Sequence, residues 1–151
     1  MNLKFSLLTG NVLALSLLST GVFSQNIKVN LTEVLSEKGQ LMVAVYNKQD
    51  HWLSDKPTEI FAQKIISLEG QITNKTLQFT LELPEGEYAL YLFQDKDNNG
   101  ELKSNWIGIP KEPVGTSNNA KGTMGPPKYK DASFQVAAED IVQNITLANM
   151  D

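Results

Sequence analysis

Two segments of this 151-residue chain, residues 41–46 and 88–93, carry an apolar side chain at every position, and they constrain the fold most strongly. Successive side chains of a β-strand point to opposite faces of the sheet. A strand that is apolar throughout therefore has two faces to bury, which is typical of a strand at the centre of a fold. We expect these two segments to be the central strands.

The other strand candidates are shorter or less regular, and several alternate apolar with polar residues as half-buried strands do. They are residues 27–31, 60–68, 77–83, 134–136 and 141–147. Residues 137–140 could form one helical turn at most. The sequence indicates no amphipathic helix of greater length. About seven short strands with turn signals between them predict an all-β chain, folded as a single antiparallel β-sandwich.

Residues 95–134 are the longest part of the chain without a period of their own. A stretch of this length inside a compact domain is usually either disordered or functional. We expect one long, ordered loop between the last strands of the sandwich. It is also the segment that we expect to carry the function.

The first residues have the pattern of a secretory signal peptide. Lys4 is followed by an interrupted apolar run over residues 5–18, and small or aliphatic residues occupy the positions expected before a cleavage site at Gln25. We predict a signal peptide over residues 1–24 and a β-sandwich domain over residues 25–151. The alternative is a buried first helix or strand. The apolar run is too short to predict a membrane span, so a periplasmic or extracellular location is expected.

The composition argues against several classes of function. The chain has no cysteine, which rules out disulfides, thiolate metal sites and cysteine nucleophiles. All 13 basic residues are lysine, so the planar, bidentate recognition of phosphate that arginine provides is missing. With a net charge of −4 and no basic run, nucleic acid is not expected as a partner.

The sequence offers no catalytic constellation. Its only histidine, His51, shares one short polar segment with Ser54 and Asp55, without the turn motif that presents a nucleophile. We therefore predict that the protein is not an enzyme and assign no catalytic residue. The tryptophans, Trp52 and Trp106, both fall in predicted loops, and we expect their rings to pack rather than to bind a ligand.

Residues 95–100 match the first half of a calcium-binding loop, D-x-[DN]-x-[DN]-G. Calcium prefers six to eight oxygen ligands, which closely spaced carboxylates and amides on a sharp glycine turn can supply. Asp95, Asp97 and Asn99 would offer side-chain oxygens, and Glu101 its backbone carbonyl. Calcium is therefore the one cofactor that the sequence suggests.

The second half of the calcium pattern is missing. Trp106 occupies the position of the bidentate glutamate, and Lys103 brings a positive charge close to the ligands. Glu112 is a weaker candidate to complete the shell, as are Asn105 and Asp131. Binding in the weak extracellular range, roughly 10⁻⁴ to 10⁻³ M, would follow. The alternative is a loop without an ion, in which Asp and Asn side chains cap their own backbone.

Six blocks of the sequence carry motifs that are informative together: residues 39–47, 83–89, 95–102, 108–113, 115–119 and 125–134. In combination they resemble the domain-of-unknown-function family 2141, which consists of small secreted bacterial proteins. The resemblance covers essentially all of residues 25–151 and departs from the family pattern at Lys103, where an acidic residue is usual, and at Thr116, where an aromatic is common. It implies a β-sandwich of the transthyretin-like or immunoglobulin-like kind, exported from the cytoplasm.

Three functions are compatible with these observations. The first is a non-enzymatic binding or accessory module that contacts a protein or glycan of the cell envelope through residues 95–134. The second is a small periplasmic hydrolase, since transthyretin-like folds include hydrolases. The sites of those hydrolases use several histidines and arginines, whereas this chain has one histidine and no arginine. The third is a purely structural envelope protein. We favour the first.

Overall fold

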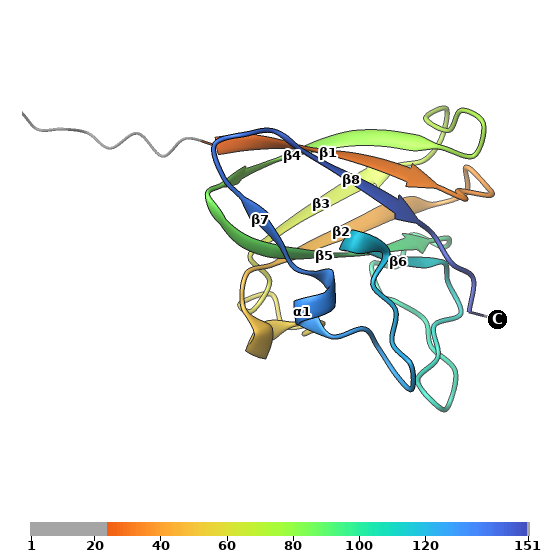
Figure 1. Cartoon of the computed structure of the whole chain (residues 1–151). Helices are drawn as coiled ribbons and strands as arrows, with labels where there is room; N and C mark the ends of the chain where they lie inside the picture. Colours follow the sequence, from red (N-terminus) through yellow and green to blue (C-terminus); the bar gives the residue numbers. More distant parts are fainter. Residues whose placement is uncertain (1–23, 151) are drawn as a thin grey trace, which may run out of the picture.

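Two β-sheets pack face to face in the computed structural model, which describes residues 24–150 (Figure 1). The smaller sheet has the strand order β4-β1-β8, formed by β4 (Leu77–Pro84), β1 (Ser24–Thr32) and β8 (Ile141–Thr146). The predicted signal peptide lies outside the described residues, apart from Ser24 at the start of β1, and stays a prediction.

The larger sheet has five strands and contains both strands that we expected to be central. Its order is β3-β2-β5, with β6 and β7 pairing along the other edge of β5. The central position of β2 and β5 is therefore confirmed. The strands are β3 (Ala62–Ser67), β2 (Gln40–Tyr46), β5 (Gly86–Asp95), β6 (Val114–Thr116) and β7 (Phe134–Val136).

One strand pair departs from the predicted antiparallel arrangement. β1 runs antiparallel to β4 but parallel to β8, with Ile27 opposite Ile141. The alternation of apolar residues in a strand fixes which face is buried. It is the same for a parallel and an antiparallel partner, so the pattern could not predict the direction of β8.

We expected the segment 95–134 to be one long loop, and the structure differs from this expectation. It contains β6, the 3₁₀ turn η2 (Ser117–Asn119) and the short helix α1 (Tyr129–Ala132). A second 3₁₀ turn, η1 (Gln49–His51), precedes β3, and the helical turn considered at residues 137–140 does not form. None of the helices within residues 24–150 has the length and apolar character needed to cross a membrane.

The core between the sheets is built from the inward faces of the strands. Alternate residues of β2 and β5 point into it, and alternate residues of β1 meet them from the other sheet. All of these side chains are 2% exposed or less: Ile27, Val29, Leu31, Leu41, Val43, Val45, Leu90 and Leu92.

A second apolar cluster covers the opposite face of the five-stranded sheet. Trp52 lies at its centre and makes edge-to-face contacts with Tyr46, Tyr91 and Tyr129 at ring-centroid distances of 5.3, 6.3 and 5.9 Å. Its indole N–H donates a hydrogen bond of 2.8 Å to the carbonyl of Pro127. The expectation that Trp52 packs is therefore confirmed. Burial raises the pKa of Tyr46 and of Tyr91 to about 12, with a smaller effect of the neighbouring charges.

The two clusters explain why β2 and β5 are apolar on both faces. One face of these strands packs against the three-stranded sheet, and the other packs against α1 and the segment around Trp52. Figure 1 shows α1 on the side of the five-stranded sheet that is turned away from β1 and β8. The segment after β5 is thus attached to the sandwich by aromatic packing.

We expect Trp52→Ala to lower the free energy of unfolding by about 3 kcal/mol, because the lost ring leaves a cavity among three tyrosines. Trp106→Ala is the matched control: its ring is 94% exposed, and the change should stay within about 0.5 kcal/mol. Urea unfolding followed by circular dichroism measures both. Equal losses in the two variants would contradict the structural role of Trp52.

Candidate metal centre

The calcium-like motif begins where β5 ends. Asp95 is fully buried, and its carboxylate accepts backbone N–H groups from Asn99 (3.2 Å) and Gly100 (2.8 Å). The side-chain amide of Gln40, its neighbour across the β2–β5 pair, donates a further hydrogen bond of 2.8 Å. Gly100 adopts a φ of 77°, which L-residues rarely take, and so allows the tight turn. These contacts fold residues 95–100 around the Asp95 carboxylate.

The sheet register brings Glu112 to the same place. Phe93 pairs with Val114 in the antiparallel β5–β6 ladder, and the Gln94 N–H donates to the carbonyl of Pro113 at 2.9 Å. Asp95 follows Gln94 on one side of the ladder, and Glu112 precedes Pro113 on the other. The neighbouring strands therefore deliver two carboxylates to one point, although 17 positions separate them in the sequence.

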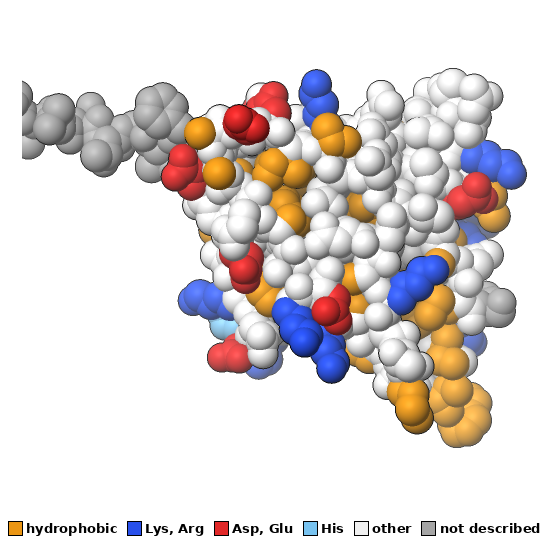
Figure 2. All heavy atoms as spheres, viewed as in Figure 1, with side chains coloured by type: hydrophobic (Ala, Val, Ile, Leu, Met, Phe, Trp, Pro, Cys, Tyr) orange, Lys and Arg blue, Asp and Glu red, His pale blue; other side chains and the backbone are white. Residues whose placement is uncertain are grey.

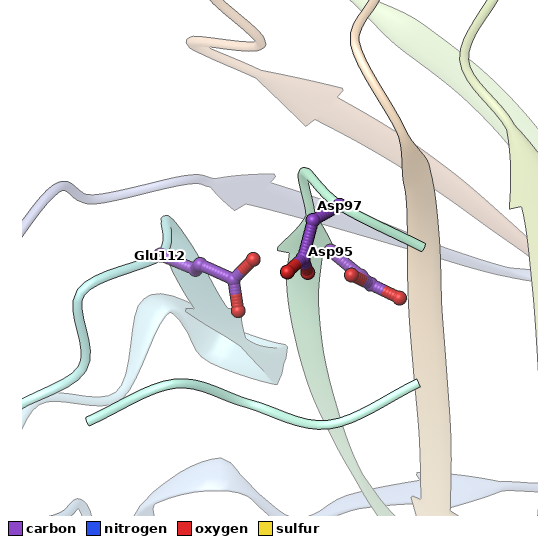
Figure 3. Close-up of side chains that lie close together, drawn as sticks. All are labelled: Asp95, Asp97 and Glu112. Atoms are coloured by element: carbon purple, nitrogen blue, oxygen red, sulfur yellow. The ribbon is translucent and has the colours of Figure 1, made fainter. Parts of the chain in front are cut away.

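Asp95, Asp97 and Glu112 form an acidic triad in which one oxygen of each lies within 4.8 Å of the others. Figure 3 shows the carboxylates of Asp97 and Glu112 facing each other, with Asp95 alongside. Asp95 and Glu112 are buried, and Asp97 is exposed. A triad of carboxylate oxygens could hold a metal ion, and an all-oxygen donor set suits a hard cation such as calcium or magnesium.

The triad carboxylates also accept hydrogen bonds from the backbone. Glu112 accepts one N–H on each oxygen, from Lys96 (2.9 Å) and from Lys103 (3.1 Å). A carboxylate oxygen has two lone pairs, so each oxygen of Glu112 keeps one for another partner. Within residues 24–150, the hydrogen bonds of Asp97 all go to its Oδ2 atom, which leaves Oδ1 open. Enough acceptor sites remain for an ion.

Lys103 lies inside the site. Its ammonium group hydrogen-bonds and ion-pairs with Asp97, and this contact, followed by smaller effects of the other triad carboxylates, raises the pKa of Lys103. We expected the positive charge of Lys103 to repel an ion. Lys103 also competes with an ion directly, because its ammonium group is paired with one of the three carboxylates. For Asp95, burial alone would raise the pKa, but the hydrogen bonds from Gln40, Gly100 and Asn99 outweigh it and lower the pKa.

The remaining sequence candidates are not members of the triad. Asn99 donates to Asp97 (3.1 Å) and accepts the Glu101 N–H (2.7 Å), so it braces the turn. The Glu101 side chain is exposed. Asn105 caps the following turn, and Asp131 is part of α1. Gln40 is the residue of the site that sequence reasoning missed, because only the β2–β5 register connects it to Asp95.

The region of His51 is organised by backbone contacts. The Ser54 N–H donates to the His51 carbonyl (3.0 Å), and the Ser54 hydroxyl oxygen accepts the N–H of Lys56 (3.2 Å).

Trp106, which was expected to pack, is 94% exposed instead, so that expectation was wrong.

A protein-family model described as an uncharacterized protein conserved in bacteria (DUF2141) matches residues 29–144. The chain belongs to this family, and the resemblance inferred from its motifs is confirmed. The match begins within β1 and ends within β8, and it includes all the strands between them and the whole acidic triad. Searches of curated proteins and of solved structures gave no match.

We expect Asp95→Asn to destabilise the fold by about 2 kcal/mol, because an amide has one acceptor oxygen while both oxygens of Asp95 accept a backbone N–H. Asp97→Asn is the matched control, since that side chain is 44% exposed, and it should cost less than about 1 kcal/mol. Urea unfolding in calcium-free buffer gives both values. A greater loss for Asp97→Asn than for Asp95→Asn would contradict the proposed role of Asp95.

Proposed function

We propose that this chain is an exported, non-enzymatic binding module that contacts a protein or glycan of the cell envelope through residues 95–134. In this proposal calcium binds at Asp95, Asp97 and Glu112 and orders the contact segment. The single observation that carries the proposal is the convergence of these three carboxylates at the base of that segment.

The location of the triad gives calcium a structural task. Asp95 and Asp97 begin the segment, and Glu112 stands two residues before β6. An ion held by all three would cross-link the two ends of the intervening chain, and such a link stabilises the conformation that binds the ion. The motif of the sequence and the register of the sheet thus supply the two halves of one site.

Export and the finer fold belong to the same proposal. The signal-peptide pattern of residues 1–24 supports a periplasmic or extracellular location. Two sheets packed face to face support a transthyretin-like or immunoglobulin-like sandwich. Calcium in the millimolar range is compatible with an extracellular module.

A hydrolase is the less favoured alternative. It would need a nucleophile in hydrogen-bond contact with the His51 ring, but the hydrogen bond between Ser54 and His51 joins their backbones, from the Ser54 N–H to the His51 carbonyl (3.0 Å). A purely structural envelope protein would show no dependence on residues 95–134 for binding a partner. The partner experiment below separates that case from a binding module.

We expect about 5 mM calcium to raise the melting temperature by about 5 °C, which corresponds to roughly 1.4 kcal/mol for a dissociation constant near 0.5 mM. Thermal unfolding is compared with sodium chloride of equal ionic strength. Asp97→Asn should abolish the shift. An unchanged melting temperature in wild-type protein at this concentration would refute the calcium site.

The competition between Lys103 and calcium provides a second test. Lys103→Gln removes the ammonium group that pairs with Asp97, so calcium should bind about three- to fivefold more tightly. Lys111→Gln, which removes an exposed lysine outside the triad, is the matched control and should leave the affinity unchanged. Isothermal titration calorimetry measures all three proteins. Weaker binding by Lys103→Gln would contradict the competition.

The binding role itself can be tested by capture from the envelope fraction. The exported protein should retain a specific partner, and Trp106→Gln, which alters only an exposed side chain of the segment, should lose it. Addition of a chelator should lower the recovery several-fold if calcium orders the contact surface. Retention of the same partner by Trp106→Gln and by Val142→Gln, a control on β8, would contradict the assignment of the surface.

A further inference from the structure

Two turns of the segment 95–134 carry the most exposed hydrophobic side chains among residues 24–150. Trp106 is 94% exposed and Met124 is 99% exposed. We call residues 103–111 the Trp106 turn and residues 121–128 the Met124 turn. Figure 1 shows both turns reaching beyond the sheets at the same corner, and Figure 2 shows hydrophobic side chains at the ends of these projections.

The Trp106 turn is held in shape by its own hydrogen bonds. The Asn105 side-chain oxygen accepts the N–H groups of Ile107 (3.1 Å) and Ile109 (2.9 Å), and the Asn105 carbonyl accepts the N–H of Gly108 (3.0 Å). The Lys111 N–H closes the base by donating to the carbonyl of Lys103 (2.8 Å).

These hydrogen bonds lower the cost of bringing the turn to an apolar surface. A backbone N–H that enters an apolar medium without a partner costs several kcal/mol, so lipid admits only backbone that is satisfied internally. Three consecutive donors at the tip of the turn, from Ile107 to Ile109, are satisfied within the turn itself. Ile107 and Ile109 are 56% and 37% exposed and extend the apolar surface next to Trp106.

The Met124 turn is also compact. A Cβ atom added to Gly122 would lie 1.8 Å from the Gly125 carbonyl oxygen, so the backbone folds back on itself tightly. Its end is attached to the sandwich through the hydrogen bond from Trp52 to Pro127. Met124 therefore projects from a short, anchored turn.

Charge has the same pattern in both turns. Each is bounded by a lysine at either end and contains no Asp or Glu, in a chain whose net charge is −4. The four lysines, Lys103, Lys111, Lys121 and Lys128, are all exposed. Lys103 is paired with Asp97, which leaves three to face a partner. Apolar tips with lysines set behind them match the two layers of an anionic bilayer surface, in which hydrocarbon lies beneath negative head groups.

We propose that the Trp106 and Met124 turns dock onto an anionic phospholipid surface. Trp106, Ile107 and Met124 enter the head-group region, where tryptophan is especially favourable, and the lysines contact the phosphates. This proposal rests on the proposed function for its contact segment, and it puts a lipid surface in place of the protein or glycan named there. A projecting, convex and positively charged surface favours lipid over a protein partner, since it offers no groove for another chain.

The test uses the exported protein and vesicles of phosphatidylcholine, alone or mixed with phosphatidylglycerol, at about 5 mM calcium, so that the contact segment is ordered as in the proposed function. Bridging of protein and lipid by calcium alone would not depend on Trp106, and the Trp106→Gln variant therefore controls for it. Wild-type protein should sediment with the phosphatidylglycerol vesicles only, and less at high salt. Trp106→Gln should lower the partition coefficient roughly tenfold. Replacement of Lys121 and Lys128 by Gln should lower it roughly fivefold per lysine.

The matched controls lie on the three-stranded sheet, away from the turns. Val142→Gln changes a side chain that is 52% exposed on β8, and Lys28→Gln removes an exposed lysine of β1. Both should bind vesicles as the wild type does, and all variants should keep the wild-type melting temperature. The fluorescence of Trp106, taken as wild type minus Trp106→Gln, should shift to the blue on binding.

The outcomes separate this proposal from the proposed function. Failure of wild-type protein to bind vesicles, or equal losses in Trp106→Gln and Val142→Gln, would overturn lipid docking. If capture from the envelope fraction still depends on Trp106 in that case, the partner is a protein or glycan and the binding module stands. If neither capture nor vesicle binding depends on Trp106, both proposals fail.

Discussion

The burial of β5 on both faces is the constraint on which the rest of the structure depends. Its inward side chains, Leu90 and Leu92, pack against the three-stranded sheet. Its outward face needs a second cover, which the strands cannot provide because both sheets already face each other. Residues 47–61 and α1 supply that cover around Trp52, and the hydrogen bond from Trp52 to Pro127 joins the two parts. The long segment after β5 is therefore part of the fold.

The central strands could be predicted from sequence because an apolar pattern on both faces is a local property. Two features could not. β6 is only three residues long and has a glycine at its centre, so its existence depends on the free edge of β5 beside it. The parallel pairing of β1 with β8 depends on how the chain travels around the sandwich, and no pattern within either strand encodes this path.

The candidate site also has one part that could be predicted from the sequence and one part that could not. Asp95 and Asp97 could be predicted because their spacing lies within six residues of sequence. Glu112 entered only as a weaker candidate, since its approach to Asp95 requires the β5–β6 register. Trp106 was predicted wrongly because burial is the usual fate of a large aromatic side chain. The hydrogen bonds of Asn105 hold the Trp106 turn outward, and that geometry is invisible until the turn is built.

The position of β1 has a consequence for how the molecule is made. β1 is the first described strand, yet it lies in the middle of its sheet, and β8, the last strand, is one of its two partners. Residues paired across this ladder, such as Asn30 and Asn144, are 114 positions apart. The three-stranded sheet therefore cannot close before β8 has been synthesised and has reached β1. Contacts of such high sequence separation slow folding, and until they form β1 keeps an unpaired edge that other chains can reach.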